Sequence, residues 1–423
     1  MGRAVYSETL AINGGPKAVQ GPLNRYKGAA LIGEEEKRAV LEVLEHKSLF
    51  RYYGPDLLYK VAQFEAAFAD YLQIPFVSAA SSGTAALRIA LAALGIGAGD
   101  EVIVPAVTFI ASIGAIVAQG AIPIFAEVDE QFTLDPAQLE ARITPRTRAV
   151  MSVHLFGIAA DMDPIMEIAK RHQIGVIEDT AQACGSFYKE RRLGTIGDIG
   201  AFSFQLEKNI TSGEGGAIAT SNEELYKRAV KYGDQGGQFP VQHGGIRDLV
   251  GGDPFIGENL RMTEIAGAIL GCQLRRLDDI LARIEHAHAV ISDGLADLHL
   301  QLQPAAPGRD RHALITGFTA QSREQAADIV RALTAEGVPA DLVYGGKPVY
   351  AARQILEQRM VARGCPFACS CTDHRHVRYS MGMCPRSEEL LARFVAIGIG
   401  PMYDDEELAA IVHGVRKVAT QLL

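Results

Sequence analysis

The uncharged stretch Val102–Ala126, VIVPAVTFIASIGAIVAQGAIPIFA, decides the fold class of this chain. It is long enough to cross a membrane, but Pro105, Gly114 and Pro123 interrupt it. We interpret it instead as a strand, a helix and a second strand, because strands of a sheet covered on both faces are apolar throughout. The stretch therefore predicts a sheet packed between helices and no membrane partner.

The same alternation continues on both sides of this stretch. Further strands are expected in VSAA before it and in TRAVMSVHL, IGVIED, AFSF and GGAIAT after it, with helical segments between most of them. Strands and helices in strict turn imply right-handed crossovers and a mostly parallel α/β sheet. Because 423 residues exceed what one core usually holds, we expect three parts. These are an irregular N-terminal arm (1–35), a large domain (36–280) and a smaller C-terminal α/β domain (281–423).

The charge and composition of the chain indicate which kind of partner to expect. The formal net charge is −9, from 41 basic and 50 acidic residues, and no Lys/Arg block stands out. Nucleic acid is therefore not expected as a partner, and a small molecule is. The N-terminus lacks the basic-then-apolar pattern of a signal peptide, which predicts a cytoplasmic protein.

Lys208 and Asp179 are the candidate catalytic residues. Asp179 ends the apolar run IGVIED, and Lys208 follows the run AFSF and precedes a glycine-rich turn, Gly213–Gly216. Ligands of parallel sheets bind at the carboxyl ends of strands. Pyridoxal phosphate requires an amine for a Schiff base and an anion beside its pyridine nitrogen. Taken singly, Lys208 also fits a surface lysine and Asp179 a helix cap.

Two further features fit the same cofactor. Ser82, Gly83 and Thr84 lie between a strand and a helix, so that backbone amides and the positive helix terminus can face a phosphate. Phe109 follows the strand EVIVP and can stack on the pyridine face, or it can belong to the core. All these candidates come to one edge of the predicted sheet, and their agreement favours a pyridoxal phosphate site.

The ordered motifs of the chain resemble the DegT/DnrJ/StrS family of sugar aminotransferases, which have the fold-type I pyridoxal phosphate architecture. The resemblance rests on EDTAQA (178–183), GTIGD (194–198), SF (203–204) with Lys208, and GEGG (213–216). It implies a large domain with a mostly parallel sheet flanked by helices and a smaller C-terminal α/β domain.

The resemblance also implies roles for single residues. Lys208 would form the Schiff base, Asp179 would face the pyridine nitrogen and Gln182 the oxygen side of the ring. The implied phosphate contacts are Gly83, Thr84, Ser203 and, from the neighbouring subunit of a homodimer with shared active sites, Asn259.

The implied reaction transfers an amino group from L-glutamate or L-glutamine to a carbonyl of a keto sugar, keto sugar acid or cyclitol in a biosynthetic pathway. The alternatives are a cofactor-dependent sugar dehydratase and a cofactor-binding regulator without turnover. Lys208 disfavours the first, because dehydrating relatives carry histidine there. Together with Asp179 it also disfavours the second.

The acceptor site is expected near Arg51, Tyr52 and Tyr53. A guanidinium suits a carboxylate or phosphate, as in the family branch that aminates eight-carbon keto sugar acids such as 8-oxo-3-deoxy-octulosonate, although Arg51 also fits a surface residue. Cys184 and Glu258 depart from the family pattern and are expected near the pocket.

A cysteine cluster near the C-terminus leaves several readings open. Cys365, Cys369 and Cys371 lie close to His374 and His376 in a spacing that matches neither paired CxxC motifs nor a zinc finger. Structural zinc, a disulfide and free thiols all remain, and no metal is expected in the active site.

Overall fold

A computed structural model of the chain describes residues 8–236, 255–361, 364–368 and 377–422. Its largest element is a seven-stranded sheet in the order β1-β9-β8-β5-β4-β2-β3. The strands are β1 Phe76–Ala80, β2 Glu101–Pro105, β3 Ile122–Ala126, β4 Thr147–Val153, β5 Gly175–Asp179, β8 Ile199–Ser203 and β9 Gly216–Thr220. A short ribbon of β6 Phe187–Tyr188 and β7 Arg191–Arg192 stands apart from this sheet.

The large sheet is mostly parallel, as predicted. β8, β5, β4, β2 and β3 pair in parallel, whereas β9 runs antiparallel to both of its neighbours, β8 and β1. β8 and β9 follow each other in the chain without an intervening helix, so Lys208 lies in the connection of a hairpin. The carboxyl ends of β5 and β8 are adjacent because these two strands pair directly.

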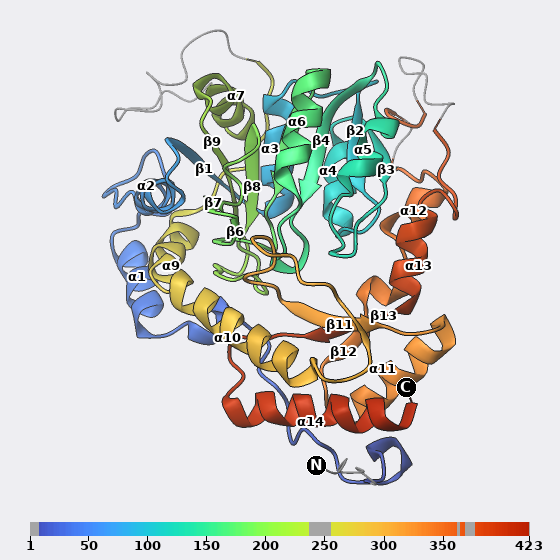
Figure 1. The fold of residues 1–423 in the computed structure, drawn as a ribbon. Helices are drawn as coiled ribbons and strands as arrows, with labels where there is room; N and C mark the ends of the chain where they lie inside the picture. Colours follow the sequence, from blue (N-terminus) through green and yellow to red (C-terminus); the bar gives the residue numbers. More distant parts are fainter. Residues whose placement is uncertain (1–7, 237–254, 362–363, 369–376, 423) are drawn as a thin grey trace.

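Helices cover both faces of the large sheet (Figure 1). α3 (Gly83–Ala93), α4 (Ile110–Ala118) and α7 (Glu223–Gly233) share one core with the side chains of one face. α2 (Lys60–Leu72), α6 (Met162–His172) and α9 (Glu264–Leu274) bury the other face in two further clusters. The other α-helices described in this lobe are α1 Glu34–Glu45 and α5 Pro136–Leu139. The uncharged stretch Val102–Ala126 contains most of β2, followed by α4 and β3. No described helix is long and apolar enough to span a bilayer.

A smaller antiparallel sheet forms the second lobe, which lies below the first in Figure 1. Its strands, in spatial order, are β10 Gln301–Leu302, β11 Ile315–Thr319, β13 Phe394–Gly398 and β12 Ala340–Leu342. Three helices pack on this sheet: α10 (Leu277–Leu295), α11 (Arg323–Ala335) and α14 (Asp405–Leu422). The other α-helices described after α11 in the chain are α12 Arg353–Leu356 and α13 Pro385–Arg393. The sequence did not predict α13 or β13. Its pattern favours one continuous helical stretch over 263–298, which the structure divides into α9 and α10.

The segment before α1 connects the two lobes. Near its start, the amides of Ala11 and Ala18 donate to the Glu336 carboxylate, which also pairs with the Lys417 ammonium at 3.0 Å inside the small lobe. At its other end Gly28 lies against the large lobe, where an added Cβ would lie 2.4 Å from Gln273 Oε1 and 2.8 Å from the carbonyl oxygen of Asn209. We call residues 20–28 the arm segment.

Candidate active site

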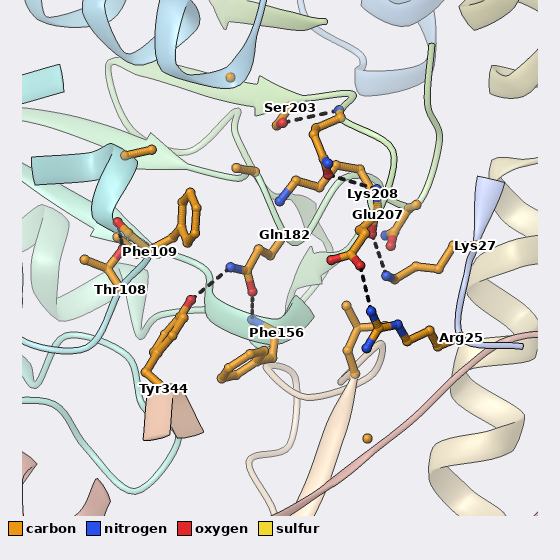
Figure 2. Close-up of a pocket in the computed structure, with 18 of the residues that line it drawn as sticks. Arg25, Lys27, Thr108, Phe109, Phe156, Gln182, Ser203, Glu207, Lys208 and Tyr344 are labelled. Carbon is orange, nitrogen blue, oxygen red and sulfur yellow. Dashed lines mark hydrogen bonds and ion pairs between the residues drawn. The ribbon is translucent and has the colours of Figure 1, made fainter. Parts of the chain in front are cut away.

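One cavity of about 940 Å³ lies at the carboxyl ends of β5 and β8, bounded by the arm segment and by residues of the small lobe. Asp179 is the last residue of β5, and Lys208 follows β8, so neighbouring strands bring both to this edge of the sheet. The cavity is lined by seven of the residues that the sequence reading selected: Gly83, Thr84, Phe109, Asp179, Gln182, Ser203 and Lys208. Figure 2 shows several of them facing a common space.

Asp179 is a buried carboxyl held by two donors. The Ser112 hydroxyl donates to its Oδ2 at 2.8 Å, and the amide of Ala181 donates to its Oδ1 at 3.2 Å. Burial raises the pKa of Asp179 above its ordinary value, against the opposing effects of the Ser112 and Ala181 hydrogen bonds and of the charge on Lys208. A cationic ring nitrogen beside this carboxyl would favour its ionised form.

Lys208 is a partly buried amine inside the cavity. Burial lowers its pKa from the ordinary value, and the charges of Asp179, Glu207 and Glu214 oppose this effect. Within the described part of the chain, no hydrogen bond or ion pair ties down its Nζ. A lowered pKa and a free amine favour the nucleophilic form of lysine that Schiff-base chemistry needs.

The start of α3 forms a cradle for an anion. Ser82 caps the helix by accepting the amide of Ala85 at 3.1 Å, and the amides of Gly83 and Thr84 have no partner among the described residues. A Cβ at Gly83 would lie 2.6 Å from Ser203 Cβ and 2.9 Å from its Oγ, so only glycine lets the helix start meet the end of β8. Two orphan amides, a hydroxyl and the positive helix end are suited to a phosphate.

Gln182 and Phe109 also line the cavity. Gln182 Oε1 accepts the amide of Phe156 at 3.0 Å, and its Nε2 donates to the Tyr344 hydroxyl at 3.3 Å (Figure 2). Phe109 directly precedes α4 and leaves 56% of its surface exposed, although the preceding residues Val107 and Thr108 are buried. An exposed ring at the edge of a cavity is available for stacking on a planar ligand.

Glu178 explains why GTIGD accompanies EDTAQA in the sequence. Its buried carboxylate accepts the amides of Gly194, Ile196 and Gly197 at 2.8, 2.6 and 2.7 Å, and it contacts His154 Nε2 at 2.9 Å. Burial alone would raise the pKa of Glu178, but His154 and the backbone amides outweigh it, and the net pKa is lowered. His154 is therefore a hydrogen-bonded residue of the core.

Four predicted site residues lie outside the walls of this cavity. Arg51 is buried and donates to Glu65 at 2.7 Å, with its guanidinium over the ring of Tyr52. Tyr53 is exposed, and its ring contacts Phe50. These three remain predictions for the acceptor site. Asn259 is also exposed, and its backbone forms an isolated antiparallel β-bridge with Asp234.

The residues that depart from the family pattern do not line the cavity either. Cys184 is buried and free, and its carbonyl accepts the side-chain amide of Asn209 at 2.9 Å. Glu258 accepts the Tyr232 hydroxyl at 2.5 Å and pairs with Arg88. Both were expected near the pocket, and Cys184 does contact Asn209, which lines the cavity.

The cysteine cluster is only partly described. Cys365 takes part in a disulfide, which favours that reading over free thiols for this residue. Cys369, Cys371, His374 and His376 lie outside the described residues. In the part of the chain that the structure describes, no three His, Cys, Asp or Glu side chains come together as metal ligands.

Several cavity residues were not found from the sequence. Arg25 and Lys27 belong to the arm segment, where no periodicity marks a position. Ser112 reaches Asp179 from α4, and Glu207 precedes the candidate lysine. The only signal available was the proximity of Glu207 to Lys208 in the sequence.

Comparison with known proteins agrees with this geometry. A model of the DegT/DnrJ/EryC1/StrS aminotransferase family matches residues 30–416. The chain belongs to this family. The L-glutamine:2-deoxy-scyllo-inosose aminotransferase of Streptoalloteichus tenebrarius is 33% identical over 357 residues, which cover 83% of this chain and 84% of that protein. The GDP-perosamine synthase of Caulobacter vibrioides is 44% identical over 239 residues, covering 56% and 62%. The chain spans about three fifths of the length of the first curated relatives that it matches.

Solved structures of the family share the fold. The S. venezuelae protein DesV, solved in complex with a ketimine intermediate, has a TM-score of 0.77 and 31% identity, with 94% of this chain and 99% of that chain covered. The 3-amino-5-hydroxybenzoic acid synthase has a TM-score of 0.78 and 26% identity, with 95% and 99% covered. The fold class and family predicted from the sequence are confirmed. The cofactor of this family is pyridoxal phosphate, and the cradle at Gly83 and Ser203 fits its phosphate.

Proposed function

We propose that this family member is a pyridoxal phosphate-dependent aminotransferase. It would transfer an amino group from L-glutamate or L-glutamine to a carbonyl of a keto sugar, keto sugar acid or cyclitol. The observation that carries the proposal is the pair of Lys208 and Asp179 at the ends of two adjacent parallel strands, in one cavity with a phosphate-type cradle.

Lys208 and Asp179 have different roles in the proposed reaction. When bound, the cofactor supplies an electron sink and carries the amino group between the two substrates. The Lys208 amine would bind the cofactor covalently and, once released, would hold and return a proton at its Nζ. Asp179 would stand beside the ring nitrogen, where its carboxylate would favour the protonated form of that nitrogen. Gly83, Thr84 and Ser203 would hold the phosphate.

Relatives support the substrate class. The names of the matched proteins state an L-glutamine donor and an inosose acceptor in one case, and a GDP-linked amino sugar product in the other. A keto sugar or a cyclitol ketone is accordingly the proposed acceptor of this chain. The lysine position argues for amino transfer rather than dehydration.

Reductive trapping tests the assignment of Lys208. Borohydride treatment of the cofactor-loaded protein followed by peptide mass spectrometry should place the label on Lys208. Lys208→Gln should abolish that label and Lys208→Ala should abolish transamination. Lys27→Gln is the matched control, because Lys27 lines the same cavity and burial lowers its pKa to about 8. A label on Lys27, or transamination by Lys208→Ala, would contradict the proposal.

We further propose a homodimer in which Asn259 contributes to the site of its neighbour. Its exposed position outside the cavity of its own chain supports this arrangement. Mixing Lys208→Ala chains with Asn259→Ala chains should restore activity, because one of the two shared sites then has both native residues. If each chain holds a complete site, mixing restores nothing. Light scattering would give the oligomeric state directly.

A further inference from the structure

The arm segment places two cations at the cavity that the amino-transfer chemistry does not use. Arg25 and Lys27 both line the wall, and Tyr26 between them does so as well. Figure 2 shows Arg25 and Lys27 reaching towards Glu207 from a segment far from it in the sequence. Arg51, which the sequence reading chose as an anion contact, is instead paired with Glu65 outside the cavity wall.

The arm segment holds these cations in a fixed place beside Lys208. Gly28 follows Lys27 directly, and a Cβ there would lie 2.8 Å from the carbonyl oxygen of Asn209 and 2.9 Å from Ile210 Cα. Because Asn209 follows Lys208 in the chain, the same contact brings Lys27 close to Lys208. Burial, and after it the charge of Lys208, lowers the pKa of Lys27 to about 8.

The charges of this pair are poorly neutralised. Lys27 Nζ donates to the backbone carbonyl of Glu207 at 2.7 Å, an uncharged acceptor, and it has no ion pair among the described residues. Arg25 has one loose contact with the Glu207 carboxylate, at 3.3 Å between two exposed side chains. An exposed pair of this kind is weak, whereas a half-buried ammonium without a counter-charge is costly. Among the described residues, Glu207 is therefore the one carboxylate in an ion pair with either cation, and that exposed pair neutralises them only weakly.

We propose that Arg25 and Lys27 form an anion-recognition site, which binds a carboxylate or phosphate of the substrate while its reacting group faces Lys208. A guanidinium with free donors and an ammonium beside it match the oxygens of such a group. The identification of the anion as part of a substrate rests on the proposed function. The anion belongs either to the acceptor sugar or to the amino donor, and both would be bound by the same chemistry.

Calorimetry on the cofactor-loaded enzyme tests this site with three probes that differ in charge: D-glucose 6-phosphate, D-glucuronate and D-glucose. We expect the two anions to bind about tenfold or more tightly than D-glucose, because hydrogen bonds to charged groups are strong. Arg25→Gln and Lys27→Gln should each reduce this preference. Lys37→Gln, on an exposed turn of α1, is the matched control and should keep it.

Glu207→Gln separates recognition from a purely structural role. If Arg25 serves to bind an anion, removing the competing carboxylate should strengthen the binding of D-glucose 6-phosphate. If the Arg25–Glu207 pair only holds the arm, the same change should not. Equal binding of the three sugars by the wild-type enzyme, or an unchanged preference in both cation variants, would overturn the proposal.

The source of the anion follows from the same variants. A larger loss of affinity for D-glucose 6-phosphate than for L-glutamine assigns the site to the acceptor, and the reverse assigns it to the donor. Failure of the proposed function would appear differently, as a wild-type enzyme that takes no amino group from any donor. An enzyme that accepts the amino group but shows no charge preference would refute only the anion site.

Discussion

Gly83→Ala is the sharpest test of the phosphate cradle. The added Cβ would lie 2.6 Å from Ser203 Cβ, where carbon atoms normally stay roughly 3.5–4.0 Å apart. The start of α3 and the end of β8 must therefore separate by about 1 Å. Overpacking of this kind costs about 1–3 kcal/mol. If the strain falls on the cradle, the affinity for pyridoxal phosphate should drop roughly 5- to 150-fold.

Titration of the apo-protein with pyridoxal phosphate, followed by the absorption of the bound cofactor, measures this affinity. Gly114→Ala is the control, since an added Cβ on this α4 glycine meets nothing within 4 Å. It should leave cofactor affinity unchanged and stabilise the protein by about 0.5–1 kcal/mol through helix propensity. Wild-type affinity in Gly83→Ala would refute the close approach of α3 to Ser203 as the reason for this glycine.

Three further predictions follow from buried charges. Lys417→Met leaves the Glu336 carboxylate without its partner in a pair whose side chains are 1% and 0% exposed, and it should cost about 3–5 kcal/mol in urea unfolding. Ser112→Ala removes a donor to the Asp179 carboxylate, which should raise the pKa of Asp179 further and move the acid limb of the rate profile to higher pH. A profile that shifts to lower pH would contradict this role. The lowered pKa of Glu178 contributes stability that is complete above its ordinary pKa of 4.5 and is lost as pH falls through the folded value. Urea midpoints of Glu178→Gln should therefore change less with pH in this range than those of the wild type.

The large sheet was predictable because its strands are buried on both faces and appear as apolar runs between turn signals. The same logic failed at β13. There α13 ends at Arg393 and β13 begins at Phe394, so no turn residue separates the helix from the strand. The sequence pattern also did not reveal the break between α9 and α10. Arg276 suits a helix by propensity, and only its pairing with Glu35 and Glu36 of α1 marks the change of direction.

The candidate site, too, could be predicted only in part. Lys208 and Asp179 follow apolar strands, and a parallel sheet gathers such strand ends at one edge, so their pairing could be predicted. The contact of Ser112 with Asp179 could not be predicted, because it depends on the strand order of the sheet, which the local sequence does not specify. Arg25 and Lys27 reach the cavity through tertiary anchors at Glu336 and Gly28, and no pattern in their own segment reports this.

The hairpin of β8 and β9 carries Ser203, Lys208 and Gly216 in a single short segment. A chimera that exchanges residues 199–220 between family members would therefore transfer Lys208 together with Ser203, whereas Asp179, Gly83 and Thr84 would stay with the recipient. The recipient would keep its own arm segment and, with it, the residues at the positions of Arg25 and Lys27. Such an exchange needs a compatible Asn209–Ile210 surface, because Gly28 rests on it. Lys208 and the two cations of the arm segment thus belong to separate pieces of chain that meet at Gly28.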